Sequence, residues 1–153
     1  MTIRPFNNAD LPAIFDIYSQ CKLDELRFEQ QTFTLLPLEE DDSRLGQLLA
    51  SAIYVYEDDG ILGYGALFQS EIRALFVPPQ ARGQGIGQRL LDFLLSKTSG
   101  ETCLYVAKTN APAKQLYKKY GFKVTDEFQT HYNGLAVQAN KMVLTPKSKL
   151  RDI

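Results

Sequence analysis

The spacing of hydrophobic residues in the first third of the chain predicts one strand followed by helices. Residues 2–6 predict a short strand. Apolar side chains then recur at helical spacing, at Leu11, Ile14, Phe15 and Tyr18. The Asn and Asp before them can cap a helix, and the proline that follows is tolerated in a first helical turn. We expect a helical or irregular segment over 22–36 and a short helix over 42–51.

The middle of the chain has the pattern of a β-sheet. Residues 53–57 and 61–68 are rich in strand formers and flank the turn residues Asp58-Asp59-Gly60, which predicts a hairpin. Residues 72–77 then form a nearly continuous apolar run, which is typical of a strand buried on both faces. Two prolines end this run, because proline cannot donate a ladder hydrogen bond.

Helices and strands alternate after the prolines. A stripe of apolar residues at helical spacing predicts a helix over 86–97. Residues 103–106 predict the next strand, and the Asn-Ala-Pro at 110–112 begins a further helix that Gly121 can end. A strand–helix–strand order implies that the two strands run parallel to each other. The loop before the first helix then lies at the carboxyl end of a strand, where open α/β sheets tend to bind ligands.

The last part of the chain predicts a long hairpin. Residues 124–132 and 135–144 flank Asn133-Gly134, which is the strongest short signal for a tight hairpin turn. With antiparallel strands on either side of the parallel pair, we expect a mixed α/β sheet. The 153 residues fit one domain, for which we expect the bounds 1–146, with a frayed tail over 147–153.

Charge and composition exclude several classes of function. The net charge is −1, which is unlike that of a protein that binds nucleic acid or a membrane surface. No apolar run approaches the length of a membrane span, and the first residues do not resemble a signal peptide, so we expect a cytoplasmic protein. Cys21 and Cys103 are far apart and have no neighbouring histidine cluster, which favours reduced thiols and no metal site.

Three alternating glycines precede the helix predicted over 86–97. Gly83, Gly85 and Gly87 allow positive φ angles and let a ligand approach the backbone closely. Successive amides at a helix N-terminus suit a phosphate or pyrophosphate, and Arg82 adds a positive charge beside them. A Walker loop is excluded because no Gly-Lys-Ser/Thr is present, and the G-x-G-x-G spacing differs from the dinucleotide fingerprint. A flexible, glycine-rich surface turn is the alternative.

This glycine loop resembles the acyl-CoA pyrophosphate signature of the GNAT superfamily of N-acetyltransferases. The signature, Q/R-x-x-G-x-G/A, corresponds to Arg82, Gly85 and Gly87. Residues 72–77 resemble the fourth strand of that family, and 110–122 (NAPAKQLYKKYGF) resembles its N-x-x-A-x-x-L-Y-x-x-x-G-F segment. The resemblance implies the acyl-CoA N-acyltransferase fold, in which flanking helices cover a mixed, mostly antiparallel sheet whose central parallel pair is splayed. It also implies acetyl-CoA as the co-substrate and no metal.

The resemblance also implies how the acetyl donor is held. Main-chain groups of the strand before the prolines would pair with the pantetheine arm, which lies between the splayed strands in this family. Backbone amides of the glycine loop would hold the pyrophosphate, one asparagine would meet the pantetheine end, and one tyrosine would lie near the sulfur. The implied contact residues are Leu75, Phe76, Val77, Arg82, Gly83, Gln84, Gly85, Ile86, Gly87, Gln88, Asn110 and Tyr117.

Acetyl transfer in this family proceeds by direct attack of an amine on the thioester. Such a reaction needs a neutral amine, stabilisation of the developing oxyanion and a proton for the leaving thiolate. A main-chain amide near 75–77 meets the second need. Tyr117 is the candidate general acid, because a phenol and a thiol are of similar basicity. Simple packing of Tyr117 on the apolar face of its helix is the alternative.

Glu71 is the candidate general base, since some protein-acetylating relatives carry a glutamate on this strand. An ion pair with Arg73 on the same face, or deprotonation of the amine through ordered water, are the alternatives. His131, the only histidine, lies at the end of the final hairpin, where it could contact the acceptor or be merely solvated.

The acceptor is indicated mainly by charge. Residues 22–44 contain more acidic than basic side chains, and an acidic rim would attract a cationic amine, although a solvated helical face is the alternative. We expect an N-acetyltransferase for the primary amine of a small cationic molecule. Protein lysines or N-termini are the alternative acceptors, and a non-catalytic acyl-CoA-sensing domain is the alternative role. A homodimer could form through the final hairpin or an edge strand.

Overall fold

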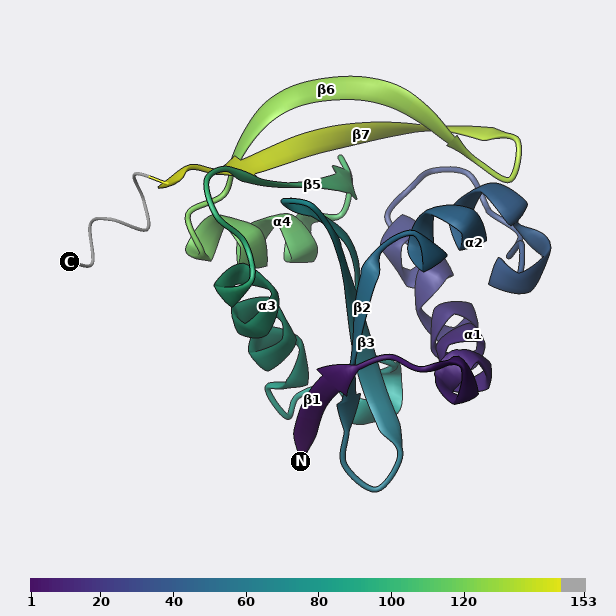
Figure 1. The fold of residues 1–153 in the computed structure, drawn as a ribbon. Coiled ribbons are helices and arrows are strands. Elements are labelled where there is room, and N and C mark those ends of the chain that lie inside the picture. The colour runs from purple at the N-terminus through teal and green to yellow at the C-terminus, as the bar shows by residue number, and fades with distance from the viewer. Residues whose placement is uncertain (147–153) are drawn as a thin grey trace.

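The computed structural model describes residues 1–146 and contains one seven-stranded sheet (Figure 1). The strands are β1 (Thr2–Pro5), β2 (Ala52–Glu57), β3 (Ile61–Phe68), β4 (Glu71–Phe76), β5 (Thr102–Ala107), β6 (Lys123–Tyr132) and β7 (Leu135–Leu144). They lie in the order β1-β2-β3-β4-β5-β7-β6, and only β4 and β5 run parallel to each other. The predicted mixed, mostly antiparallel sheet is confirmed. The tail expected over 147–153 lies outside the described residues.

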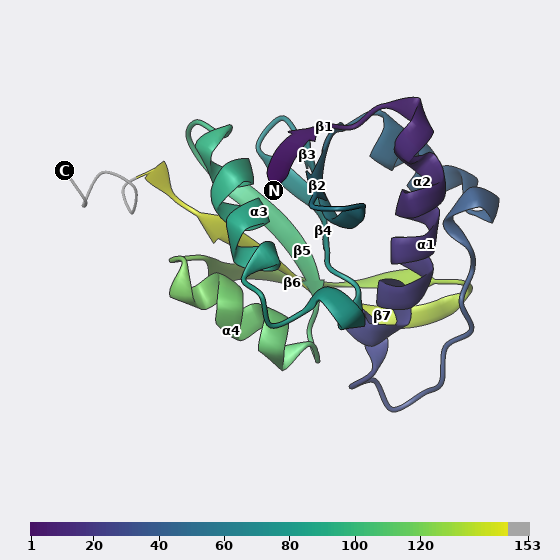
Figure 2. The same ribbon diagram turned by 90° about the horizontal axis from the view of Figure 1, so that it is seen from below.

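Helices cover both faces of the sheet, with α1 and α2 on one face and α3 and α4 on the other (Figure 2). The helices are α1 (Leu11–Cys21), α2 (Asp42–Leu49), α3 (Ile86–Ser96) and α4 (Ala111–Lys119). Short 3₁₀ turns are η1 (Asn8–Asp10), η2 (Lys22–Leu26), η3 (Leu38–Glu40) and η4 (Pro79–Ala81). Of the segment 22–36 only η2 is helical. Within residues 1–146, no helix is long and apolar enough to cross a membrane.

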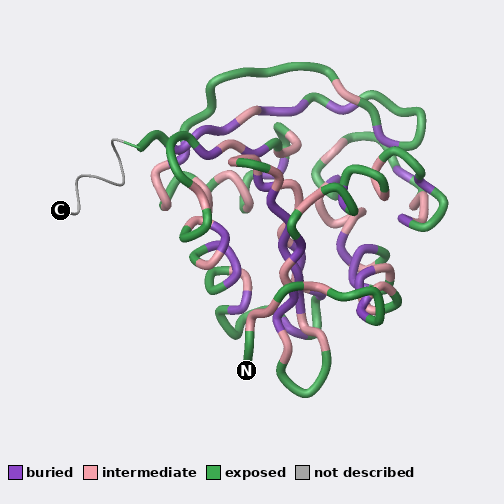
Figure 3. Tube along the Cα trace, in the orientation of Figure 1, coloured by how far each residue is buried: buried purple, intermediate pink, exposed green. Residues whose placement is uncertain are grey.

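A separate apolar core lies under each helical layer. The core beneath α1 includes Ile14, Ile17, Tyr18, Val55, Tyr64 and Phe76. The core beneath α3 includes Leu67, Leu91, Leu94, Leu104, Phe122 and Met142. Burial of each such side chain stabilises the fold by about 1.5–3 kcal/mol. The central strands carry side chains for both cores and are therefore buried along most of their length (Figure 3).

The parallel strands β4 and β5 pair only at their first residues. Glu71 lies opposite Cys103 and Ile72 opposite Leu104, and the pairing ends there although both strands continue. The predicted splay of the parallel pair is thus present. Ile72 and Phe76 are buried, but the rest of β4 is half-buried. The prediction of a strand buried on both faces therefore holds only in part, because the opening beside β5 exposes β4.

The final hairpin holds the irregular segment that follows η2. Its turn has φ angles of 48° at Asn133 and 83° at Gly134, as the Asn-Gly pair predicts. The Tyr132 hydroxyl accepts from the amide of Leu36 at 2.7 Å and donates to the carbonyl of the same residue at 3.3 Å. The Asn133 side-chain amide donates to the carbonyl oxygen of Thr34 at 3.0 Å. Residues 34–36 and the turn of the final hairpin, which are far apart in the sequence, therefore lie side by side.

The close approach of α3 to the sheet depends on a glycine in β3. A Cβ at Gly63 would lie 3.0 Å from the carbonyl oxygen of Phe76 and 3.2 Å from Leu90 Cδ1. We therefore expect Gly63→Ala to lower the free energy of unfolding by about 1–3 kcal/mol, because the crowded backbone of β4 must shift. Urea denaturation measures this change. Gly46→Ala is the control, since a Cβ there meets no atom within 4 Å and alanine favours a helix. Equal destabilisation by both substitutions would contradict the crowding.

Candidate functional site

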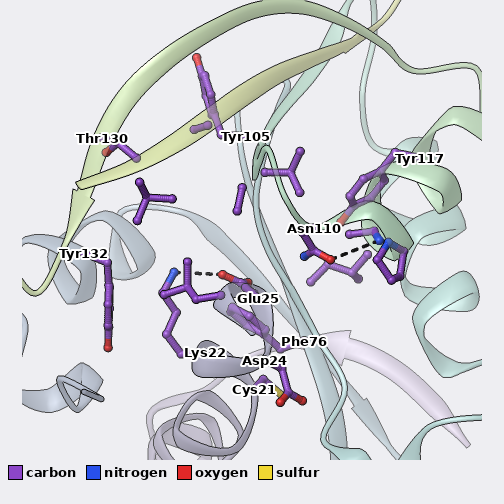
Figure 4. Close-up of a pocket in the computed structure, with 18 of the residues that line it drawn as sticks. Cys21, Lys22, Asp24, Glu25, Phe76, Tyr105, Asn110, Tyr117, Thr130 and Tyr132 are labelled. Atoms are coloured by element: carbon purple, nitrogen blue, oxygen red, sulfur yellow. Dashed lines mark hydrogen bonds and ion pairs between the residues drawn. The ribbon is translucent and has the colours of Figure 1, made fainter. Parts of the chain in front are cut away.

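A cavity of about 1110 Å³ lies where β4 and β5 separate (Figure 4). Both helical layers line it, with Lys22 and Glu25 of η2 on one side and Leu116 and Tyr117 of α4 on the other. Residues of β6 and β7 add a third wall. The cavity is large enough for a cofactor-sized ligand.

The backbone of β4 has an open edge at this cavity. Beyond Ile72, the N–H and C=O groups that face β5 meet no strand, whereas the opposite edge of β4 pairs with β3 as far as Phe76. Backbone groups away from bulk water need hydrogen-bond partners. An extended ligand could therefore pair with this edge. Leu75, Phe76 and Val77, which the sequence assigned to the donor, all line the cavity.

The glycine loop lies between the end of β4 and the start of α3. Gly83 and Gly85 have φ angles of 82° and 79°, and a Cβ at either would meet no atom within 4 Å. These glycines are therefore needed for their backbone conformation and not for space. Gly85 is the N-cap of α3 and supplies no side-chain acceptor, which leaves the first amides of α3 without a side-chain cap. Such amides can bind an anion.

Arg82 connects two walls of the cavity. Its Nε donates to the carbonyl oxygen of Val77 at 2.9 Å, and its Nη1 lies 2.9 Å from Asp24 Oδ2. Its other terminal nitrogen lies 3.8 Å from the sulfur of Cys21. The Arg82 guanidinium, which was predicted to lie beside the pyrophosphate, is thus bound to the end of β4 and to η2. In this arrangement the loop offers an anion its backbone amides.

Both cysteines are free, and neither is an activated nucleophile. Burial raises the pKa of the Cys21 thiol to about 11, although the Arg82 guanidinium opposes this shift. Burial also raises the pKa of Cys103, and the Glu71 carboxylate adds to that shift. Both groups are therefore thiols at neutral pH, which agrees with acyl transfer without an acyl-enzyme.

Asn110 is buried at the start of α4, directly after β5. Its side-chain oxygen accepts from the amide of Ala113 at 3.5 Å and so caps the helix. Within residues 1–146, no group accepts from its side-chain nitrogen, and the side chain lines the cavity. Asn110 can therefore cap α4 and still donate a hydrogen bond to a ligand.

Tyr117 lines the cavity from α4. Its ring packs edge-to-face against Phe122, with the ring centres 5.8 Å apart. Burial raises the pKa of its hydroxyl above the ordinary value near 10, and the Glu25 carboxylate adds to the shift. The phenol is therefore protonated throughout the physiological range. This position fits both the packing and the proton donation predicted for it.

Glu71 begins β4 and pairs with Arg73. The distance between Glu71 Oε1 and Arg73 Nε is 3.5 Å, and the guanidinium also donates to the carbonyl oxygen of Gln47 at 3.0 Å. β4 has a bulge at Arg73, and the bond to Gln47 places the Arg73 side chain on the α2 face of the sheet. The ion pair predicted as the alternative role is thus present, and Glu71 also lines the cavity.

The lining of the cavity contains as many basic as acidic side chains. The acidic ones are Asp24, Glu25, Glu71, Asp126 and Glu127, and the basic ones are Lys22, Arg27, Arg44, Arg82 and Lys141. Ion pairs join Lys22 to Glu25 and Asp24 to Arg82, and Asp41 pairs with Arg44. Of the acidic residues expected to form a rim, Asp24, Glu25 and Asp41 are thus paired with basic side chains, and Glu29, Glu39, Glu40 and Asp42 do not line the cavity. His131 lines the cavity, and its carbonyl oxygen accepts from Arg44 at 3.1 Å.

Three further side chains face the cavity without a clear signal in the sequence. They are Lys22, Glu25 and Tyr132. Glu25 was one of several carboxylates in an acidic segment, and no local spacing set it apart. Tyr132 belongs to the far end of the chain, so only the folded structure brings it to η2.

Comparison with known proteins identifies related sequences. Residues 50–124 match the family model described as an acetyltransferase (GNAT) domain. Peptidyl-lysine N-acetyltransferase YjaB of Salmonella typhimurium is 40% identical over 73 residues, which cover 48% of this chain and 50% of YjaB. Peptidyl-lysine N-acetyltransferase YiaC of Escherichia coli is 27% identical over 128 residues, which cover 81% of this chain and 84% of YiaC. The chain thus aligns with about half the length of YjaB.

A solved structure has the same fold. It is that of YncA from Salmonella typhimurium, described as a putative acetyltransferase with its cofactor acetyl-CoA. The TM-score is 0.67 at 24% sequence identity, and the match covers 95% of this chain and 94% of YncA. The agreement extends over nearly the whole chain and includes both helical layers.

The cap formed by Asn110 gives a test that separates its structural role from any contact with a ligand. We expect Asn110→Ala to lower the free energy of unfolding by about 1 kcal/mol, because α4 loses its N-cap acceptor. Asn110→Asp keeps an acceptor and should retain nearly all of the stability. Chemical denaturation of both variants measures the difference. Equal stability of the alanine variant and the unmodified protein would show that the 3.5 Å contact does not cap the helix.

Proposed function

This chain belongs to the GNAT family of acetyltransferases, and we propose that it transfers an acetyl group from acetyl-CoA to a primary amine. The opening between β4 and β5, with the glycine loop at its end, supports this proposal most directly. A strand edge without a partner suits an extended amide-bearing arm. Uncapped helix amides suit a pyrophosphate at the end of that arm.

The residues around the opening fit such a donor. Main-chain groups of Leu75, Phe76 and Val77 would pair with the pantetheine arm along the open edge of β4. The amides from Gly83 to Gln88 would hold the pyrophosphate, and the free donor of Asn110 would meet the pantetheine end. Bound acetyl-CoA would supply the acetyl thioester that the amine attacks.

The side chains in the cavity support direct transfer. The amine nitrogen forms a bond to the acetyl carbon while the bond from that carbon to sulfur breaks. A main-chain amide at the end of β4 would stabilise the developing oxyanion. Tyr117 would give its proton to the departing thiolate, and its raised pKa keeps that proton in place until then. The phenol regains a proton from solvent after the products leave.

The amine must lose a proton before it attacks. Glu71 is the proposed acceptor of this proton, because its carboxylate lines the cavity on the acceptor side of the sheet. Its ion pair with Arg73 fixes the carboxylate at the start of β4. Ordered water that leads from the amine to this carboxylate is the alternative route, and His131 at the rim could relay the proton.

We propose a small cationic amine as the acceptor and a peptide lysine as the second candidate. Two of the relatives, YjaB and YiaC, are named as peptidyl-lysine N-acetyltransferases. The cavity wall also carries an exposed aromatic pair, Tyr105 and Phe128, whose ring centres lie 5.6 Å apart. Such a surface could contact the residues on either side of an acetylated lysine.

The cellular location and the oligomeric state are proposed from the cysteines and from the edge strand β6. We propose a cytoplasmic protein, because Cys21 and Cys103 are both unpaired. We also propose that two copies could pair through β6, since this strand forms one edge of the sheet and most of it is exposed. Size measurement by light scattering tests this pairing, and a monomer at all concentrations would contradict it.

The function is tested by thiol release from acetyl-CoA with a panel of amines. The panel contains spermidine, an aminoglycoside, an Nα-acetyl-lysine amide and a short peptide with a free N-terminus. We expect release with at least one of them, and mass spectrometry of the product then identifies the acetylated amine. Tight binding of CoA without transfer to any amine would instead favour a sensing domain.

The role of Tyr117 is tested by removing only its hydroxyl. We expect Tyr117→Phe to lower kcat by about 10²–10⁴-fold with little change in the KM for acetyl-CoA, because the hydroxyl acts on the leaving thiolate. Because burial raises the pKa of Tyr117, the unmodified enzyme should show no alkaline loss of kcat from this group below about pH 10. Tyr120→Phe, at the C-cap of the same helix, is the control. Unchanged kcat for Tyr117→Phe across the pH range would exclude the phenol as the acid.

A further inference from the structure

Lys22, Glu25 and Tyr132 form a compact group on the acceptor side of the cavity. The Lys22 ammonium lies 3.0 Å from Glu25 Oε2 and 5.2 Å from the centre of the Tyr132 ring. A carboxylate together with the face of an aromatic ring is a favourable environment for an alkylammonium ion. In Figure 4 the side-chain nitrogen of Lys22 points to the Glu25 carboxylate inside the cavity.

The Lys22 side chain is more buried than is usual for a lysine. Its side chain is 15% exposed, whereas lysine generally keeps its ammonium in water. Ion pairs of this kind contribute little to the stability of a fold, because desolvation offsets the attraction between the charges. The contacts of Lys22 therefore show that the surroundings of Glu25 accommodate an ammonium group. The stability of the fold alone does not explain this arrangement.

The core beneath α1 contains a buried hydroxyl that has no partner among residues 1–146. Tyr18 is 4% exposed, and no described residue forms a hydrogen bond with its hydroxyl. Burial raises the pKa of Tyr18, and the nearby Tyr132 and Glu25 add to the shift. The hydroxyl thus lies within electrostatic range of both residues. Tyr18 itself does not line the cavity, so the unpaired hydroxyl contributes to the electrostatic surroundings of Glu25 from the core.

Glu25 also lies across the cavity from Tyr117, the proposed general acid. Its carboxylate contributes to the raised pKa of Tyr117, which belongs to the opposite helical layer. Figure 4 shows Glu25 between Tyr132 on one side and Asn110 and Tyr117 on the other. An ammonium group bound at Glu25 would therefore lie across the cavity from Tyr117, the phenol that would protonate the leaving thiolate (Figure 4).

We propose that Glu25 and Tyr132 bind the ammonium group of the acceptor, in the place that the Lys22 ammonium holds in the structure. This inference rests on the proposed function and narrows its acceptor. The preferred substrate carries a primary ammonium on a slender alkyl chain, as a lysine side chain or one end of a polyamine does. Lys22 then competes with the acceptor and must leave Glu25 before the acceptor binds.

Binding of n-butylammonium tests the proposal without any acetyl transfer. The ion reproduces the end of a lysine side chain, and calorimetric titration in the presence of CoA leaves no acetyl group to move. We expect Glu25→Gln to weaken binding by about ten-fold and Lys22→Met to tighten it by about ten-fold. 1-Butanol is the uncharged control ligand, and its binding should be the same in both variants.

Matched variants and a separate titration make the result decisive. Two exposed control positions should leave n-butylammonium binding unchanged: Glu39→Gln in η3 and Lys97→Met at the C-cap of α3. CoA affinity equal to that of the unmodified protein shows that a variant is folded, and if Glu25→Gln does not fold, Glu25→Asp should weaken binding to a smaller extent. Unchanged binding in both Glu25 variants, or weaker binding in Lys22→Met, would overturn the proposal. Failure of the unmodified protein to bind CoA would instead contradict the proposed function, and the ammonium titration can be repeated without CoA.

Discussion

The separation of β4 from β5 after two residue pairs is the constraint on which the rest of the structure depends. A continuous parallel pair would satisfy its own backbone groups and leave no space between the two helical layers. Because the strands separate, β4 has one paired edge and one open edge, and the cavity connects the two faces of the sheet. The glycine loop then lies at the end of the open edge, where uncapped amides of α3 meet the same cavity.

Arg82 links the part of this opening that suits an anion to the part that suits an amine. Its bond to the Val77 carbonyl lies at the end of β4, and its ion pair with Asp24 lies on η2, next to Glu25. Any movement of the guanidinium toward an anion at the glycine loop would therefore release Asp24. The charge next to Glu25 thus depends on the position of the Arg82 guanidinium, although the glycine loop and η2 belong to different layers.

Local patterns in the sequence were sufficient for most of the fold. The Asn133-Gly134 turn, the apolar stripe of α3 and the glycine loop each depend on residues close together in the chain, and each was predicted. The direction of the Arg82 side chain and the group around Glu25 were not predicted, because they depend on contacts between distant segments. The bulge at Arg73 was also missed. Alternation along β4 correctly placed Arg73 on the same face as Glu71, but nothing in that alternation marks the extra residue.

The bonds from Tyr132 and Asn133 to Leu36 and Thr34 join residues 96 and 99 positions apart. During synthesis on a ribosome, the segment after η2 emerges early and has no partner until the last hairpin follows it. Contacts of such long range form late, whereas β3, β4, α3 and β5 are close neighbours in the chain and can assemble first. We therefore expect the wall formed by residues 34–36 and the final hairpin to become ordered late in folding. If this wall contacts the acceptor as proposed, a new acceptor preference requires compatible changes in two segments that are far apart in the gene.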